Sequence, residues 1–86
     1  MLKIQRFEEG KYAVFALSGR IEPENLEQLK VLLKAERQAV ILDLREVNLV
    51  AREVVSFLAL CKEDDIGLRD CPAYVREWIA RERAEK

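Results

Sequence analysis

Six consecutive apolar residues, Tyr12 to Leu17, constrain the fold of this chain more than any other segment. The run is rich in strand-forming residues and is closed by Ser18-Gly19. A strand that is apolar at every position is typical of a sheet covered on both faces. We expect it to pair, through a hairpin turn at Gly10, with a first strand in which Leu2 and Ile4 alternate with Lys3 and Gln5. Phe7 breaks this alternation, so the first strand is expected to end or bulge there.

Helical and strand patterns then alternate along the rest of the chain. A helix is predicted from Pro23 to about Ala35, followed by a strand over Val40–Leu44. A second helix is predicted over roughly Ala51–Lys62, a short strand over Ile66–Leu68 and a last helix after Pro72. This order predicts one α/β domain over residues 1–86, with a four-stranded mixed sheet (β-β-α-β-α-β-α) and helices mostly on one face.

Composition excludes several classes of partner. Fifteen basic and 16 acidic residues give a formal net charge of -1, so there is no general attraction for nucleic acid. No apolar run approaches the ~20 residues that span a bilayer, and the first residues do not resemble a signal peptide. We therefore expect no membrane insertion, a cytoplasmic location, and Cys61 and Cys71 as reduced thiols.

The residues that support catalysis or metal binding are scarce. The chain has no histidine, neither cysteine belongs to a CxxC pair, and its three glycines are far apart. The sequence thus offers neither a phosphate-binding loop nor a nucleophile with its base. We expect no metal, no cofactor and no enzymatic activity, with a small-ligand-binding domain as the less favoured alternative.

Two segments carry a family resemblance. Ala13–Ile21 ends a strand in a glycine before the first helix, and Ala39–Val47 contains a hydrophobic-Leu-Asp-Leu-x-x-Val pattern. Both segments, and the leucine-rich helix between them, resemble the STAS family of anti-sigma-factor antagonists over about residues 1–80, without a clear fifth strand or fourth helix. The resemblance implies a non-catalytic protein-binding role, with a kinase-like anti-sigma factor as the partner.

The family's phosphoacceptor turn aligns with Ala51-Arg52-Glu53-Val54, in which no hydroxyl remains. Glu53 stands at the phosphoacceptor position, so serine phosphorylation at the usual site is not expected. Glu53 is either a partial mimic of a phosphate or an ordinary first-turn glutamate. The hypothetical partner-binding residues are Asp43, Asn48, Ala51, Arg52 and Glu53.

Several alternatives remain open. Loss of the phosphoacceptor favours a STAS-like subunit of another assembly, such as a stress-signalling scaffold or a membrane transport complex. Asp43 either belongs to the partner site or accepts from nearby loop N–H groups. Cys71 is either a reactive thiol at a helix start or a buried small hydrophobe. Tyr74 and Trp78 either pack in the core or form an exposed patch. A shortened chain with uncovered apolar surface favours a homodimer.

Overall fold

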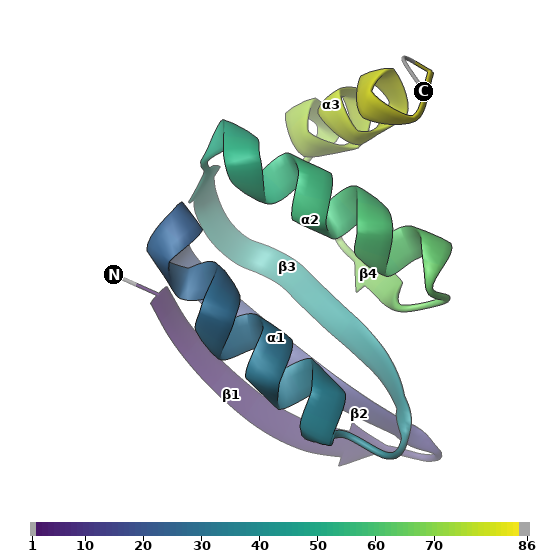
Figure 1. The fold of residues 1–86 in the computed structure, drawn as a ribbon. Coiled ribbons are helices and arrows are strands. Elements are labelled where there is room, and N and C mark those ends of the chain that lie inside the picture. The colour runs from purple at the N-terminus through teal and green to yellow at the C-terminus, as the bar shows by residue number, and fades with distance from the viewer. Residues whose placement is uncertain (1, 85–86) are drawn as a thin grey trace.

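The computed structural model describes residues 2–84 of the 86-residue chain. Its elements, in the order shown in Figure 1, are β1 (Leu2–Glu9), β2 (Tyr12–Ile21), the 3₁₀ turn η1 (Pro23–Asn25), α1 (Leu26–Ala35), β3 (Ala39–Val50), α2 (Arg52–Glu63), β4 (Gly67–Arg69) and α3 (Ala73–Ala84). This order confirms the predicted α/β arrangement.

The four strands form one mixed sheet in the order β1-β2-β3-β4. β1 and β2 are antiparallel, and β2–β3 and β3–β4 are parallel. Gly10 has φ +58° at the hairpin, as the sequence predicted for the turn. Both crossover helices, α1 and α2, lie over the same face of the sheet, and α3 packs against α2 (Figure 1).

The core lies between this face and the helices. Alternate residues of β2 and β3 point inward, and α2 supplies the largest share of the helical contribution. Among the side chains of α3 that the structure describes, Val75 and Ile79 are buried in this core. The core residues of the strands and of α2 are Ala13, Phe15, Leu17, Ile21, Val40, Leu42, Leu44, Val47, Val50, Val54, Val55, Phe57, Leu58, Ala59 and Cys61.

Among the described residues, no helix covers the opposite face of the sheet. Helices therefore cover β2 on one face only, and not on both as its apolar run suggested. Val14 is nevertheless fully buried on this face, between Phe7 on β1 and Ile41 on β3. Glu9 and Arg69, from the two edge strands, form an ion pair on this face. By register, Glu9 lies on one side of the row formed by Val14 and Ile41, and Arg69 lies on the other side. Side chains of the strands themselves thus shield the open face.

β3 is longer than the predicted Val40–Leu44 and continues to Val50. The register against β2 shifts twice, between Ala16 and Ser18 and between Gly19 and Arg20, and β3 has one extra residue at each shift. These bulges change the spacing of buried residues from two to three, which hides the strand pattern in the sequence. β2 likewise runs past Ser18-Gly19, with Gly19 at φ +95° beside the second bulge.

Candidate protein-interaction surface

The start of α2 positions three of the predicted site residues. Ala51 is the N-cap in an extended conformation, and its N–H donates to the Ile21 carbonyl at 3.0 Å. The Ala51 carbonyl accepts from the N–H of Val54 at 2.9 Å and begins the helix. Arg52 and Glu53 follow in the first turn with exposed side chains. The side chain of Ala51 cannot cap the helix, so the first N–H groups of α2 have no side-chain acceptor at the N-cap.

Asn48 lies at the same end of the sheet, in the last part of β3, and is exposed. The neighbouring Leu49 is 43% exposed, which is unusual for a leucine in the longest strand of a sheet. Asn48 and Leu49 therefore belong to the same end of the molecule as Ala51, Arg52 and Glu53.

Asp43 does not join this group. Residues 44–50 of β3 lie between Asp43 and Ala51, which corresponds to about 25 Å of extended strand. The Asp43 carboxylate accepts the backbone N–H of Arg45 at 3.0 Å, and Asp43 pairs with Arg69 of β4. Asp43 thus accepts from nearby backbone, but the donor lies within β3 and not in a loop as expected. The extension of β3 beyond Leu44 is the reason for the separation.

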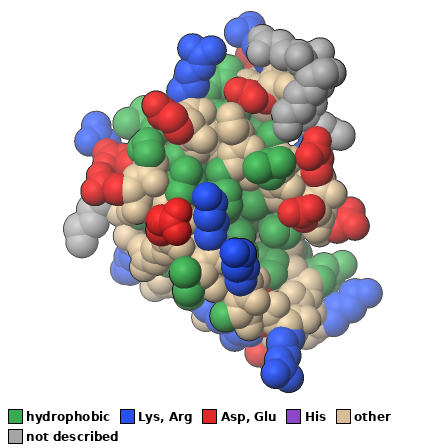
Figure 2. Space-filling view, in the orientation of Figure 1, with side chains coloured by type: hydrophobic (Ala, Val, Ile, Leu, Met, Phe, Trp, Pro, Cys, Tyr) green, Lys and Arg blue, Asp and Glu red, His purple; other side chains and the backbone are tan. Residues whose placement is uncertain are grey.

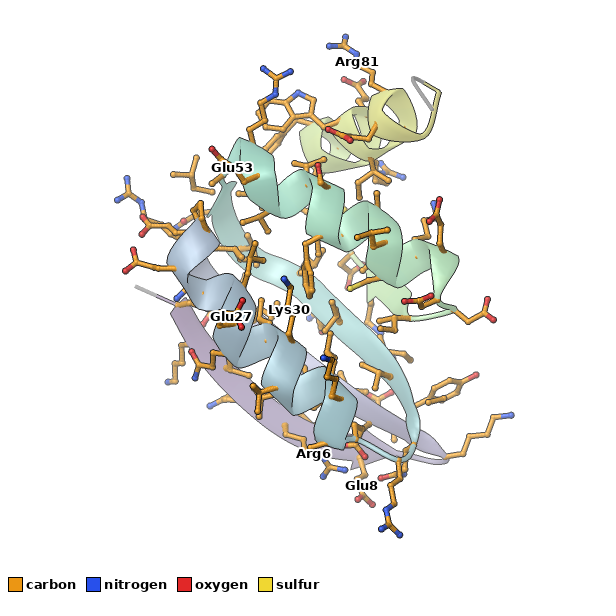
Figure 3. All side chains as sticks on the ribbon, viewed as in Figure 1. Arg6, Glu8, Glu27, Lys30, Glu53 and Arg81 are labelled. Atoms are coloured by element: carbon orange, nitrogen blue, oxygen red, sulfur yellow. The ribbon has the colours of Figure 1, made fainter. Side chains whose placement is uncertain are left out.

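A pocket of about 340 Å³ opens between the start of α2 and α3. Arg52 and Val55 line it from α2, and Trp78, Arg81 and Glu82 line it from α3. The two guanidinium groups outnumber the single carboxylate, and Val55 and the indole provide apolar surface. Figure 3 shows Glu53 at the start of α2 and Arg81 on α3 at the same end of the molecule. This arrangement suits an acidic, partly apolar segment of a binding partner.

The contribution of α3 to this pocket was not predicted from the sequence. Tyr74 and Trp78 are 38% and 37% exposed, with rings 5.8 Å apart in a T-shaped arrangement, so they form an aromatic patch at the surface. The side chains that anchor α3 are Val75 and Ile79. Their i, i+4 spacing is the signal that could have placed Trp78 beside the core and not inside it.

Both cysteines have the character of apolar residues. Burial, with a smaller effect from the Asp64 carboxylate, raises the pKa of Cys61 to about 11. Burial also raises the pKa of Cys71, which disfavours the reactive thiolate considered for the helix start. Within residues 2–84, no three acidic, cysteine or histidine side chains are placed to hold a metal ion.

Comparison with known proteins shows the fold alone. No protein-family model matches the chain, and no curated protein matches it. Eight chains of solved structures do match. One, described as "Crystal Structure Analysis of Mglu", has 19% sequence identity and a TM-score of 0.58 over 80% of this chain. This chain spans only 19% of that one. None of the helices in the described range is long and apolar enough to cross a bilayer.

Proposed function

We propose that this chain is a non-catalytic protein-interaction module of the STAS type. It docks a protein partner through the surface formed by Asn48, the start of α2 and the adjoining pocket of α3. The observation that carries the proposal is the pocket itself, where Arg52, Trp78 and Arg81 combine positive charge with an exposed indole. Arginine and tryptophan are the residue types that most often dominate the binding energy of protein interfaces.

The docking surface has no serine or threonine to modify in the family's phosphoacceptor turn. Residues 51–54 read Ala-Arg-Glu-Val, and Glu53 carries a permanent charge on the first turn of α2. A module with this turn binds its partner without a phosphorylation switch at that position. The partner suggested by the family is a kinase-like anti-sigma factor.

The same observation favours a second candidate, a STAS-like subunit of a stress-signalling scaffold or a transport complex. An interaction that never has to be released by phosphorylation suits a permanent assembly better than a switch. The two candidates use the same surface and differ in the partner.

A charge-reversal pair tests the proposal. The tagged protein, its Arg52→Glu variant and its Lys62→Glu variant are used to capture partners from native lysate for mass spectrometry. Both variants change the net charge equally and alter exposed helical residues. We expect a partner that is captured by the parent and by Lys62→Glu and is lost with Arg52→Glu.

The identity of that partner decides between the two candidates. A kinase-like protein supports the antagonist role, and a scaffold or transport subunit supports the second. Equal capture by both variants contradicts the proposed surface, and a small molecule retained without any protein contradicts the binding-module function.

A further inference from the structure

A second surface lies on the helical side of the molecule, away from the pocket of α3. α1 and α2 both cover the sheet but hardly contact each other, and a groove of about 310 Å³ separates them. Its lining is mostly apolar and includes Leu33, Phe57, Leu60, Cys61 and Ile66, with Lys30, Lys34 and Asp64 at the rims. Phe57 lines the groove, is 9% exposed and belongs to the core cluster, so the groove reaches the edge of the core.

The two most exposed large apolar side chains of the described chain lie on the two helices that border this groove. Val31 on α1 is 64% exposed and Leu60 on α2 is 50% exposed. The outward positions of an amphipathic helix are normally polar, so an exposed Val31 and an exposed Leu60 are unusual on helices that face only water. Figure 2 shows hydrophobic side chains exposed through the middle of this face, with basic side chains across them and acidic ones at the sides.

The charges on the rims differ in sign between the two helices. α1 contributes Lys30 and Lys34, one turn apart, and α2 contributes Asp64 at its C-terminal end. A two-fold symmetric interface must be self-complementary, because each copy presents the same surface to the other. A two-fold axis along the groove brings α1 of one copy over α2 of the other, so that Lys34 meets Asp64 of the second copy twice.

From these observations we propose that the α1–α2 face is a homodimer interface, and that the occupant of the groove is a second copy of this chain. Val31 of each copy covers the apolar surface around Leu60 of the other, and Lys34 pairs with Asp64 across the interface. The arrangement leaves the pocket of Arg52 and Trp78 free on both copies, so each dimer presents two docking surfaces. The dimer does not depend on the proposed partner.

Sedimentation velocity of the full chain tests the interface at concentrations on the order of tens of micromolar. The parent is expected to sediment with twice the mass of the chain. Leu60→Lys is expected to sediment as a monomer, while Leu49→Lys, which alters a leucine of similar exposure on β3, stays dimeric. Fluorescence of the single tryptophan, Trp78, and circular dichroism verify that each variant is folded.

A mixing experiment identifies the paired residues. Lys34→Glu and Asp64→Lys are each expected to sediment as monomers, because each places like charges opposite each other twice. An equimolar mixture of the two is expected to recover the dimer mass, since both contacts then join opposite charges.

Three outcomes overturn the proposal. One is a parent chain that sediments as a monomer. This includes the case in which the groove binds a different protein, so that Leu60→Lys abolishes capture of that protein from lysate. Another is a dimer dissolved by Leu49→Lys and not by Leu60→Lys. The third is a mixture of the two charge variants that stays monomeric.

Discussion

Glu9 and Arg69, sixty residues apart in sequence, form a bidentate ion pair across the open face of the sheet. Arg69 Nη1 donates to Glu9 Oε2 at 2.9 Å and Nη2 donates to Oε1 at 3.1 Å. The pair connects β1 with β4, the two edge strands, and the hydrogen bonds from Arg69 lower the pKa of Glu9. On the other face, Arg6 donates to Glu36 at 2.8 Å and lowers the pKa of that carboxyl too.

These two pairs predict the acid sensitivity of the fold. Because the folded state lowers the pKa of Glu9 and Glu36, each contributes stability above the unfolded pKa of about 4.3, lost as pH falls through the folded value. Glu24 acts in the opposite sense, because hydrogen bonding and repulsion from Glu22 raise its pKa. We expect the urea midpoint to fall between pH 6 and pH 3, with a shallower fall for Glu9→Gln/Glu36→Gln. An equal fall in both proteins contradicts the assignment.

Leu58 tests the core beneath α2. It is fully buried, and Leu58→Ala is expected to lower the free energy of unfolding by about 2–5 kcal/mol. Leu60, two residues away on the same helix, is half exposed, so Leu60→Ala should change it by about 0.5 kcal/mol or less in dilute solution. Urea titration followed by Trp78 fluorescence measures both. Similar losses for the two variants would mean that α2 is rotated from the described orientation.

Gly19 tests the second bulge. Its φ of +95° disfavours any side chain, so Gly19→Ala is expected to cost about 1–3 kcal/mol. Gly67→Ala is the matched control on β4, where the new Cβ would lie 3.4 Å from the Cγ1 of Ile41 and the change should stay below about 1 kcal/mol. A Gly19→Ala variant as stable as the parent would contradict the positive φ of Gly19 and the bulge beside it.

The thiols should react slowly in the folded protein. Only the thiolate is nucleophilic, and burial raises the pKa of both Cys61 and Cys71. Labelling with a disulfide reagent near neutral pH is expected to be much slower than in urea, and slowest at Cys61, which is the more deeply buried. Mass spectrometry of the labelled peptides distinguishes the two. Cys71 reacting as fast folded as unfolded would restore the reactive-thiol hypothesis.

The order of strands and helices was predictable because each element has a clear apolar spacing. The length of β3 was not, since its two bulges place Leu44, Val47 and Val50 three residues apart. Because β3 continues to Val50, Asp43 lies far from the start of α2 and not beside it as predicted. Arg52 and Glu53 could be placed on a helix start from the sequence alone.

The pocket beside Arg52 depends on how α3 packs against α2, which is a tertiary contact. The sequence predicts an apolar stripe on the last helix that includes Tyr74, Val75, Trp78 and Ile79. Of these, the structure buries Val75 and Ile79 and leaves Tyr74 and Trp78 partly exposed. A small rotation of an amphipathic helix changes which aromatic side chains reach solvent. The local pattern does not determine that rotation, because several overlapping stripes satisfy the same helical period.

Photo-crosslinking from position 52 tests the proposed docking surface most directly. A photoreactive amino acid replaces Arg52 in one sample and Gln28, an exposed residue of α1, in the other, and both are irradiated in native lysate. The proposal predicts a discrete adduct with a protein other than a second copy of this chain from position 52, and no such adduct from position 28. Adducts of the same protein from both positions, or no protein adduct from position 52, would contradict it.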